Sequence, residues 1–151
     1  MILNIHQDAK KAMIEDALNA YPDECCGFFF GFDDGQNRTI SSILVVNNSK
    51  QGDKRRRFEI SPQDYLKAER YADDNNLQLL GVYHSHPDHP AIPSETDRKS
   101  AQPFFSYIII SIVGGKLNNL RSWQLSVDND VGKDGHQFEE ESIFKDLVKD
   151  A

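Results

Sequence analysis

The sequence predicts a single domain of the α/β (α+β) class, in which a mixed, mostly antiparallel β-sheet is flanked by helices. Short apolar stretches typical of buried strands alternate with amphipathic helical stretches, but no regular strand–helix–strand repeat runs through the chain. The 151 residues suffice for one substantial core and are too few for two. A content of 38% hydrophobic and 27% charged residues is ordinary for a globular domain. We therefore expect residues 1–151 to fold as one unit.

The N-terminal third is expected to contain one helix followed by a β-hairpin. Residues 7–20 repeat apolar side chains at the spacing of one helical face. Residues 25–32 form an apolar run of strand length, and residues 33–37 supply the Asp, Gly and Asn typical of a turn. Residues 39–47 are rich in β-branched side chains and complete the hairpin.

The central third predicts a strand, a helix and a second strand. Residues 57–60 alternate polar and apolar side chains, as a half-buried strand does. Ser61 and Pro62 are typical of a helix start, with serine at the N-cap and proline at the first helical position. That helix should run to about residue 75, and residues 79–84 should form a buried strand that ends on a histidine.

The last third begins with a loop at residues 87–93, which its prolines make stiff. Ser94 is placed to cap a short helix over residues 95–101. Two further strands and a short terminal strand or helix are expected at residues 105–113, 120–127 and 144–148.

Composition narrows the classes of function. A formal net charge of −7 offers little to nucleic acid, whose phosphates bind basic surfaces. The longest apolar runs, residues 25–32 and 107–113, are far shorter than the roughly 20 residues of a membrane span. The N-terminus lacks the layout of a signal peptide, so we expect a cytoplasmic protein. Cys25 and Cys26 are adjacent and poorly placed to pair, which argues against a secreted disulfide framework.

Three side chains that commonly bind metals occur within fourteen residues: His84, His86 and Asp97. Residues two apart on a strand project to the same side, so the two imidazoles can converge on one ion, and the stiff loop can return the aspartate as third ligand. Two imidazoles and one carboxylate favour zinc over magnesium or calcium. Three protein ligands leave a tetrahedral position open, as catalytic zinc requires. An isolated H-x-H would be a weak signal, but Ser94 and Glu24 accompany this one.

The chain resembles the JAMM (MPN-type) zinc metalloproteases, whose signature it matches at His84, His86, Ser94 and Asp97. Glu24 precedes Cys-Cys-Gly at the head of an apolar strand and is similar to the upstream catalytic glutamate of that family. The resemblance covers roughly residues 11–127 and looks like the prokaryotic branch. It implies the JAMM/MPN (cytidine-deaminase-like) architecture.

The resemblance also implies a role for each matched residue. His84, His86 and Asp97 would bind one zinc ion per chain. Glu24 would act as general base, and Ser94 would position the water and stabilise the tetrahedral oxyanion. The reaction implied is hydrolysis of an amide bond, by a peptidase or isopeptidase.

The substrate that the resemblance implies is the C-terminal tail of a protein. Prokaryotic relatives of this size resemble enzymes that trim ubiquitin-like sulfur carriers of the ThiS/MoaD type at or beyond their C-terminal Gly-Gly. We therefore expect a small ubiquitin-like carrier protein or peptide tail as partner, entering a groove as an extended segment that can pair with a strand edge. Neither nucleic acid nor membrane is expected as a partner, and a homodimer is compatible with the sequence.

Two other classes of protein are open alternatives. Some MPN domains are non-catalytic interaction scaffolds, but these usually lack one or more ligands, whereas this chain keeps all five chemical positions. A zinc deaminase would show H-x-E followed by P-C-x-x-C, and neither occurs.

Several residues near the predicted site are not expected to take part in the chemistry. Residues 54–57, Lys-Arg-Arg-Arg, are either a solvated loop or a docking patch for an acidic partner. His89 is expected to face solvent, and Asp88 to lie at the rim of the site. Cys25 and Cys26 open a buried strand, so we expect buried thiols rather than a nucleophile.

Overall fold

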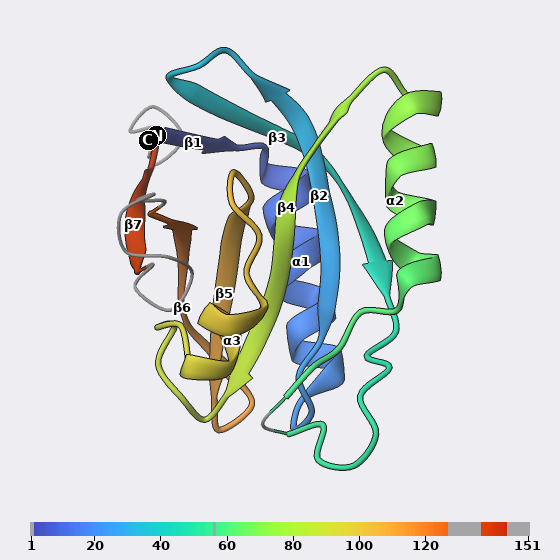
Figure 1. Ribbon diagram of the computed structural model, residues 1–151. Helices are drawn as coiled ribbons and strands as arrows, with labels where there is room; N and C mark the ends of the chain where they lie inside the picture. Colours follow the sequence, from blue (N-terminus) through green and yellow to red (C-terminus); the bar gives the residue numbers. More distant parts are fainter. Residues whose placement is uncertain (1, 56, 127–136, 145–151) are drawn as a thin grey trace.

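The structure is a computed structural model that describes residues 2–55, 57–126 and 137–144. In this part of the chain a closed barrel has the strand order β1-β3-β2-β4-β5-β6-β7 (Figure 1). Its strands are β1 (Ile2–Ile5), β2 (Cys26–Asp33), β3 (Asn37–Val46), β4 (Gln78–Pro87), β5 (Ser106–Val113), β6 (Lys116–Leu125) and β7 (Phe138–Ile143). The helices are α1 (Gln7–Ala20), α2 (Pro62–Asp74) and α3 (Glu95–Ser100).

The predicted mixed sheet is confirmed. Neighbouring strands are antiparallel in four pairs, β2–β3, β2–β4, β5–β6 and β6–β7. They are parallel in three, β1–β3, β1–β7 and β4–β5. Antiparallel pairs are therefore the majority, and β4 lies between an antiparallel neighbour, β2, and a parallel neighbour, β5.

Two helices cover opposite faces of the central strands (Figure 1). Successive side chains of β2 point to opposite faces, so Phe29 packs with the α1 residue Met13 while Phe28 and Phe30 pack with Ala72 of α2. All three phenylalanines are fully buried. None of the described helices has the length and apolar character needed to cross a membrane.

The predicted helix starts are confirmed in detail. Ser61 caps α2 by accepting a hydrogen bond from the Asp64 N–H at 3.2 Å, and Pro62 occupies the first helical position. Ser94 caps α3 in the same manner. These starts were predictable because the cap and the first turn are adjacent in sequence.

The sequence-based strand assignment was incomplete at both ends of the chain. It missed β1, in which only Leu3 and Ile5 are buried, because four residues carry too little alternation. It missed β7, whose run of glutamates conceals a strand that pairs with β6 and β1. The predicted terminal element at residues 144–148 lies outside the described residues except for Phe144.

The prediction of a strand at residues 57–60 was wrong. This segment is extended but belongs to no strand, because its partner is largely a side chain. Asn48 Oδ1 accepts from the Glu59 N–H at 3.1 Å, and Asn48 Nδ2 donates to the Arg57 carbonyl at 3.0 Å. A polar side chain thus takes the place of a neighbouring strand along one edge.

Strand register brings the two halves of the predicted site together. Cys26 on β2 pairs with His84 on the antiparallel β4. The chain continues from this pair so that Cys25 lies beside Ser85, whose N–H donates to the Cys25 carbonyl at 3.2 Å. Glu24, far from the histidines in sequence, therefore reaches the end of β4 where they lie.

Candidate active site

Two histidines and an aspartate converge at the end of β4. The strand continues past its predicted end at His84 to include His86, and Asp97 lies on the first turn of α3. His84 Nε2 is 3.1 Å from His86 Nε2 and 3.3 Å from Asp97 Oδ2, and His86 Nε2 is 3.2 Å from the same oxygen. We call these three atoms the ligand triangle.

The ligand triangle fits one face of a tetrahedral zinc site. Zinc bonds of about 2.0–2.1 Å at tetrahedral angles place neighbouring ligand atoms about 3.3–3.4 Å apart. The edges of the triangle, 3.1, 3.2 and 3.3 Å, are close to that spacing. Imidazole and carboxylate donors suit zinc, and a fourth position is left for a reactant.

A carbonyl group orients the second histidine. His86 Nδ1 lies 2.8 Å from the Pro90 carbonyl oxygen, which can only accept, so Nδ1 carries the proton and donates it. The lone pair of the neutral ring is then on Nε2, at the ligand triangle. This is the arrangement usually found around a metal-binding histidine.

Ser94 and Asp97 hold each other through a capping box. Ser94 Oγ accepts from the Asp97 N–H at 3.0 Å, and Asp97 Oδ2 accepts from the Ser94 N–H at 2.9 Å. Burial alone would raise the pKa of Asp97, but the charge of His84 and hydrogen bonds with His84, His86 and the Ser94 N–H hold that pKa well below its usual range. Asp97 is therefore ionised, with its Oδ2 at one corner of the ligand triangle.

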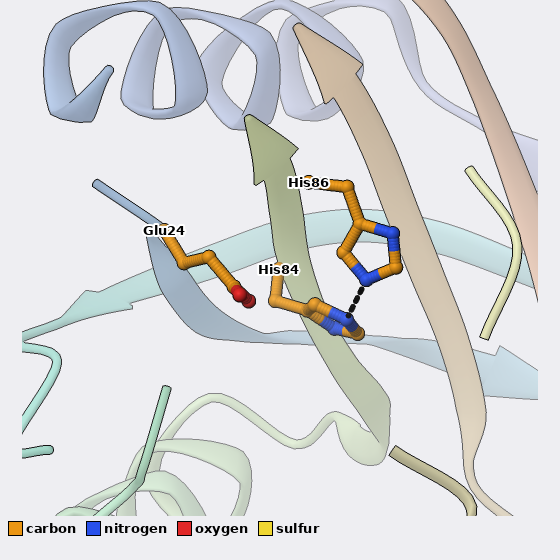
Figure 2. Close-up of side chains that lie close together, drawn as sticks. All are labelled: Glu24, His84 and His86. Carbon is orange, nitrogen blue, oxygen red and sulfur yellow. Dashed lines mark hydrogen bonds between the residues drawn. The ribbon is translucent and has the colours of Figure 1, made fainter. Parts of the chain in front are cut away.

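Glu24 points its carboxylate toward the two imidazoles from the segment that precedes β2 (Figure 2). One carboxylate oxygen and one nitrogen of each histidine lie within 4.8 Å of one another. Glu24 is 5% exposed, and burial, followed by the charges of Asp97 and Asp53, raises its pKa to about 9. A cation at the ligand triangle would oppose this rise by favouring the carboxylate.

The backbone around Glu24 is fixed by three contacts that sequence reasoning missed. The Glu24 N–H donates to the Lys54 carbonyl at 2.7 Å, and the Glu24 carbonyl accepts from Asn48 Nδ2 at 3.2 Å. One residue on, the Cys25 N–H donates to Ser85 Oγ at 2.8 Å. Ser85 lies inside the H-x-H pattern, but only the strand register reveals its partner.

Residues 6–126, most of the chain, match the family described as prokaryotic homologs of the JAB domain. The chain belongs to this family. It is 29% identical to a desampylase of Pyrococcus furiosus over 73% of this chain and 72% of that protein. It is 31% identical to a CysO-cysteine peptidase of Mycobacterium tuberculosis over 82% of this chain and 83% of that protein. A solution structure from Desulfitobacterium hafniense has 29% identity and a TM-score of 0.77 over 94% of this chain and 91% of that one.

Membership of the JAB family confirms the predicted resemblance and the predicted class of activity, since the protein is a peptidase of the JAMM type. The scaffold alternative assumed a defective site. In this JAB domain every predicted position is present, and four of them, Glu24, His84, His86 and Asp97, direct side-chain atoms to one small region.

Two cavities adjoin the site of this JAB domain. The first, of about 310 Å³, is lined by Lys50, Arg57, Phe58, Glu59, Ile60, Tyr65, Val82, His84, Ser94, Thr96, Asp97, Ser100 and Tyr107. The second, of about 560 Å³, is lined by Glu24, His86, His89, Pro90, Ile92 and Ser94. Ser94 borders both, so the site lies at their junction.

Phe58 is a further residue that sequence reasoning missed. Its ring stacks on His84 with centroids 4.4 Å apart and planes 26° from parallel, which fixes the orientation of the imidazole. His84 Nδ1 is buried and has no hydrogen-bond partner among the described residues. Stacking on Phe58, together with the contacts of Nε2, therefore orients this histidine.

The structure partly corrects the predictions for the residues next to the site. His89 is exposed, as predicted, but it also borders the second cavity. Asp88 is a structural contact: its carboxylate accepts from the Tyr21 hydroxyl at 2.8 and 2.9 Å and from the Gly114 N–H at 2.9 Å. Cys25 and Cys26 are free and buried, and burial raises the pKa of both thiols, as expected of residues that are not nucleophiles.

Proposed function

We propose that the protein is a zinc-dependent peptidase or isopeptidase that hydrolyses an amide bond at the C-terminal tail of a ubiquitin-like sulfur carrier of the ThiS/MoaD type. The observation that carries the proposal is the ligand triangle, whose edges of 3.1–3.3 Å suit one zinc ion, with the Glu24 carboxylate beside it. His84, His86 and Asp97 would hold the ion. We also propose that residues 1–151 act as one domain.

Glu24 supplies the proton transfers. Zinc at the ligand triangle would polarise the scissile carbonyl and lower the pKa of a water toward about 7. The Glu24 carboxylate accepts a proton from the attacking water and later donates it to the departing amine nitrogen. Its burial separates the transferred proton from bulk water.

Ser94 stabilises the oxyanion without losing its role as a cap. Its Oγ accepts from the Asp97 N–H, which uses a lone pair and leaves the hydroxyl hydrogen available. Among the described residues no acceptor takes that hydrogen. Because Ser94 borders both cavities, its hydroxyl can donate to an oxygen that becomes negative between them.

The tail binds in the first cavity beside the extended segment 57–60. Peptide groups of alternate residues in such a segment face opposite edges. Arg57 and Glu59 use one edge, with Asn48 and with the Ser49 N–H, which donates to the Glu59 carbonyl at 2.9 Å. The N–H and carbonyl of Phe58 face the other edge and have no partner within the described ranges. A substrate tail that adds there as a strand would complete the pairing.

The relatives support a protein tail as substrate. One carries the name desampylase, and another is a peptidase named for CysO and cysteine. An extended tail in the first cavity would leave the second for the group that departs. We propose the cytoplasm as the place of action, which suits two free cysteines.

Metal analysis tests the proposal. The gently purified protein should contain about one zinc per chain, and removal by a chelator should abolish cleavage of a carrier tail peptide until zinc is restored. Less than half an equivalent of zinc, or full activity after chelation, would contradict it. Circular dichroism of the chelated protein separates loss of metal from loss of fold.

A further inference from the structure

The sequence places five of the 17 basic residues within eight positions, at residues 50–57. We propose that the described members of this group, Lys50, Lys54, Arg55 and Arg57, form a docking surface for an acidic face of the carrier whose tail is cleaved. We call these four residues the basic loop. The inference rests on the proposed function, because it names the second point at which that substrate is held.

The basic loop offers charge that the protein itself does not neutralise. Lys54, Arg55 and Arg57 are exposed, and within the described ranges none of the four makes an ion pair with a carboxylate. Asp53 is the one carboxylate in the sequence of residues 50–57, and Glu59 follows two residues later, so the acids are fewer than the cations. The loop thus carries an excess of positive charge, although the protein as a whole has a net charge of −7.

Three of the four arginines described outside the basic loop form ion pairs. Arg38 lies 2.9 Å from Asp33, Arg98 pairs with Glu95, and Arg121 pairs with Glu140. The described arginines outside the basic loop are thus largely committed to contacts that hold the fold. Exposed charge without a partner contributes little to stability, so its concentration in one loop points to an intermolecular use.

The basic loop is joined to the reactive centre in two ways. Lys50 and Arg57 line the first cavity, which also contains His84 and Asp97. The Lys54 carbonyl accepts from the Glu24 N–H at 2.7 Å, so the loop and the general base are held at a fixed separation. A carrier seated on the loop would therefore present its tail to the cavity beside the ligand triangle.

Charge complementarity identifies the occupant as an acidic protein face. The net negative charge of the molecule would repel such a partner, whereas the basic loop would attract it, which both speeds encounter and favours one orientation. A small loop on an acidic protein is a poor platform for nucleic acid, which needs several basic contacts along its backbone. Binding of nucleic acid is accordingly an outcome that would contradict the proposal.

The test compares two charge reversals of equal size, Lys54→Glu/Arg55→Glu and Lys10→Glu/Lys11→Glu. The control residues are exposed and lie early in α1, at the end of that helix away from the site (Figure 1). Both pairs are made in a Glu24→Gln background, and binding of a ThiS/MoaD-type carrier with one residue beyond its Gly-Gly is measured by calorimetry. Salt concentrations of about 0.02 M and about 0.3 M bracket strong and weak screening.

We expect the Lys54/Arg55 reversal to weaken carrier binding about tenfold or more at low salt and to remove most of its salt dependence. The Lys10/Lys11 reversal should change binding by less than about twofold, as expected of distant surface charge. In the background with Glu24 intact, the ratio of kcat/KM for the carrier to kcat/KM for its isolated tail peptide should fall by a similar factor.

Equal effects of the two reversals, salt-independent binding, no carrier binding, or equally tight binding of a single-stranded RNA would overturn the docking surface. The outcomes separate it from the proposed function. Charge-dependent binding without cleavage of carrier or peptide would refute the proposed reaction and leave the docking surface standing. If the carrier and the peptide are both cleaved and the Lys54/Arg55 reversal changes neither rate, the docking surface is refuted and the proposed reaction stands.

Discussion

Asn48 provides the sharpest test of how the structure positions Glu24, the proposed general base. Its side chain makes four hydrogen bonds of 3.0–3.2 Å: it donates to the carbonyls of Glu24 and Arg57 and accepts from the N–H groups of Lys50 and Glu59. Asn48→Asp keeps the two accepted bonds and removes the two donated ones. It also places a carboxylate oxygen against two carbonyl oxygens, so the backbone of Glu24 should move away.

The magnitude follows from the bonds lost. Two hydrogen bonds at about 1 kcal/mol each predict a loss of about 2 kcal/mol in the free energy of unfolding. If about half of that free energy is also lost from the transition state because the Glu24 carboxylate moves, kcat falls about fivefold. A displacement of the carboxylate by about 1 Å would lower kcat about 100-fold. Asn48 contacts none of the atoms of the ligand triangle, so zinc content should stay at one per chain.

The assay measures kcat and KM for a tail peptide, zinc content and thermal unfolding of Asn48→Asp. Asn47→Asp is the matched control, because Asn47 is exposed and the change in charge is the same. We expect Asn47→Asp to behave as wild type. A wild-type kcat for Asn48→Asp would refute the positioning role, and a loss of zinc in parallel with kcat would show that the effect reaches the metal instead.

Three further substitutions probe other parts of the structure. Glu24→Gln should keep its zinc and lose about 10²- to 10⁴-fold in kcat, and near-normal turnover would exclude it as the base. His86→Ala should lose both zinc and activity, and an unchanged metal content would refute its assignment. Burial raises the pKa of Glu141, against hydrogen bonds from Ser106 and Ser122 and the charge of Arg38. Its contribution to stability is therefore complete below its unfolded pKa and declines as the pH rises through the folded one. Glu141→Gln should remove that decline, so its melting temperature relative to wild type should be higher at pH 8 than at pH 4, and the reverse order would contradict the sign.

The parts of the site that the sequence could predict are those with local signals. His84 and His86 share a face because they are two apart on one strand, and Ser94 marks the helix start that carries Asp97. The role of Glu24 was assigned only through the family resemblance, since the register of β2 on β4 that brings it to the histidines cannot be read from its own neighbours.

The parts that could not be predicted depend on tertiary contacts. Residues 57–60 have the alternation of a strand, but Asn48 takes the edge that a strand would need by bonding to residues nine and eleven positions away. Phe58 has no metal chemistry of its own and acts by stacking on His84. Ser85 resembles a spacer in the pattern, yet its hydroxyl accepts from the N–H of Cys25, the residue after Glu24.

The most direct test of the central claim is the mass of a carrier after incubation with the zinc-loaded protein. The substrate is a ThiS/MoaD-type carrier with residues added beyond its C-terminal Gly-Gly, and Glu24→Gln serves as the matched inactive control. We predict a product that ends at Gly-Gly, formed by the wild type and not by the variant. An unchanged carrier mass with one zinc bound per chain, or equal cleavage by Glu24→Gln, would contradict the claim that this site hydrolyses the tail of a ubiquitin-like carrier.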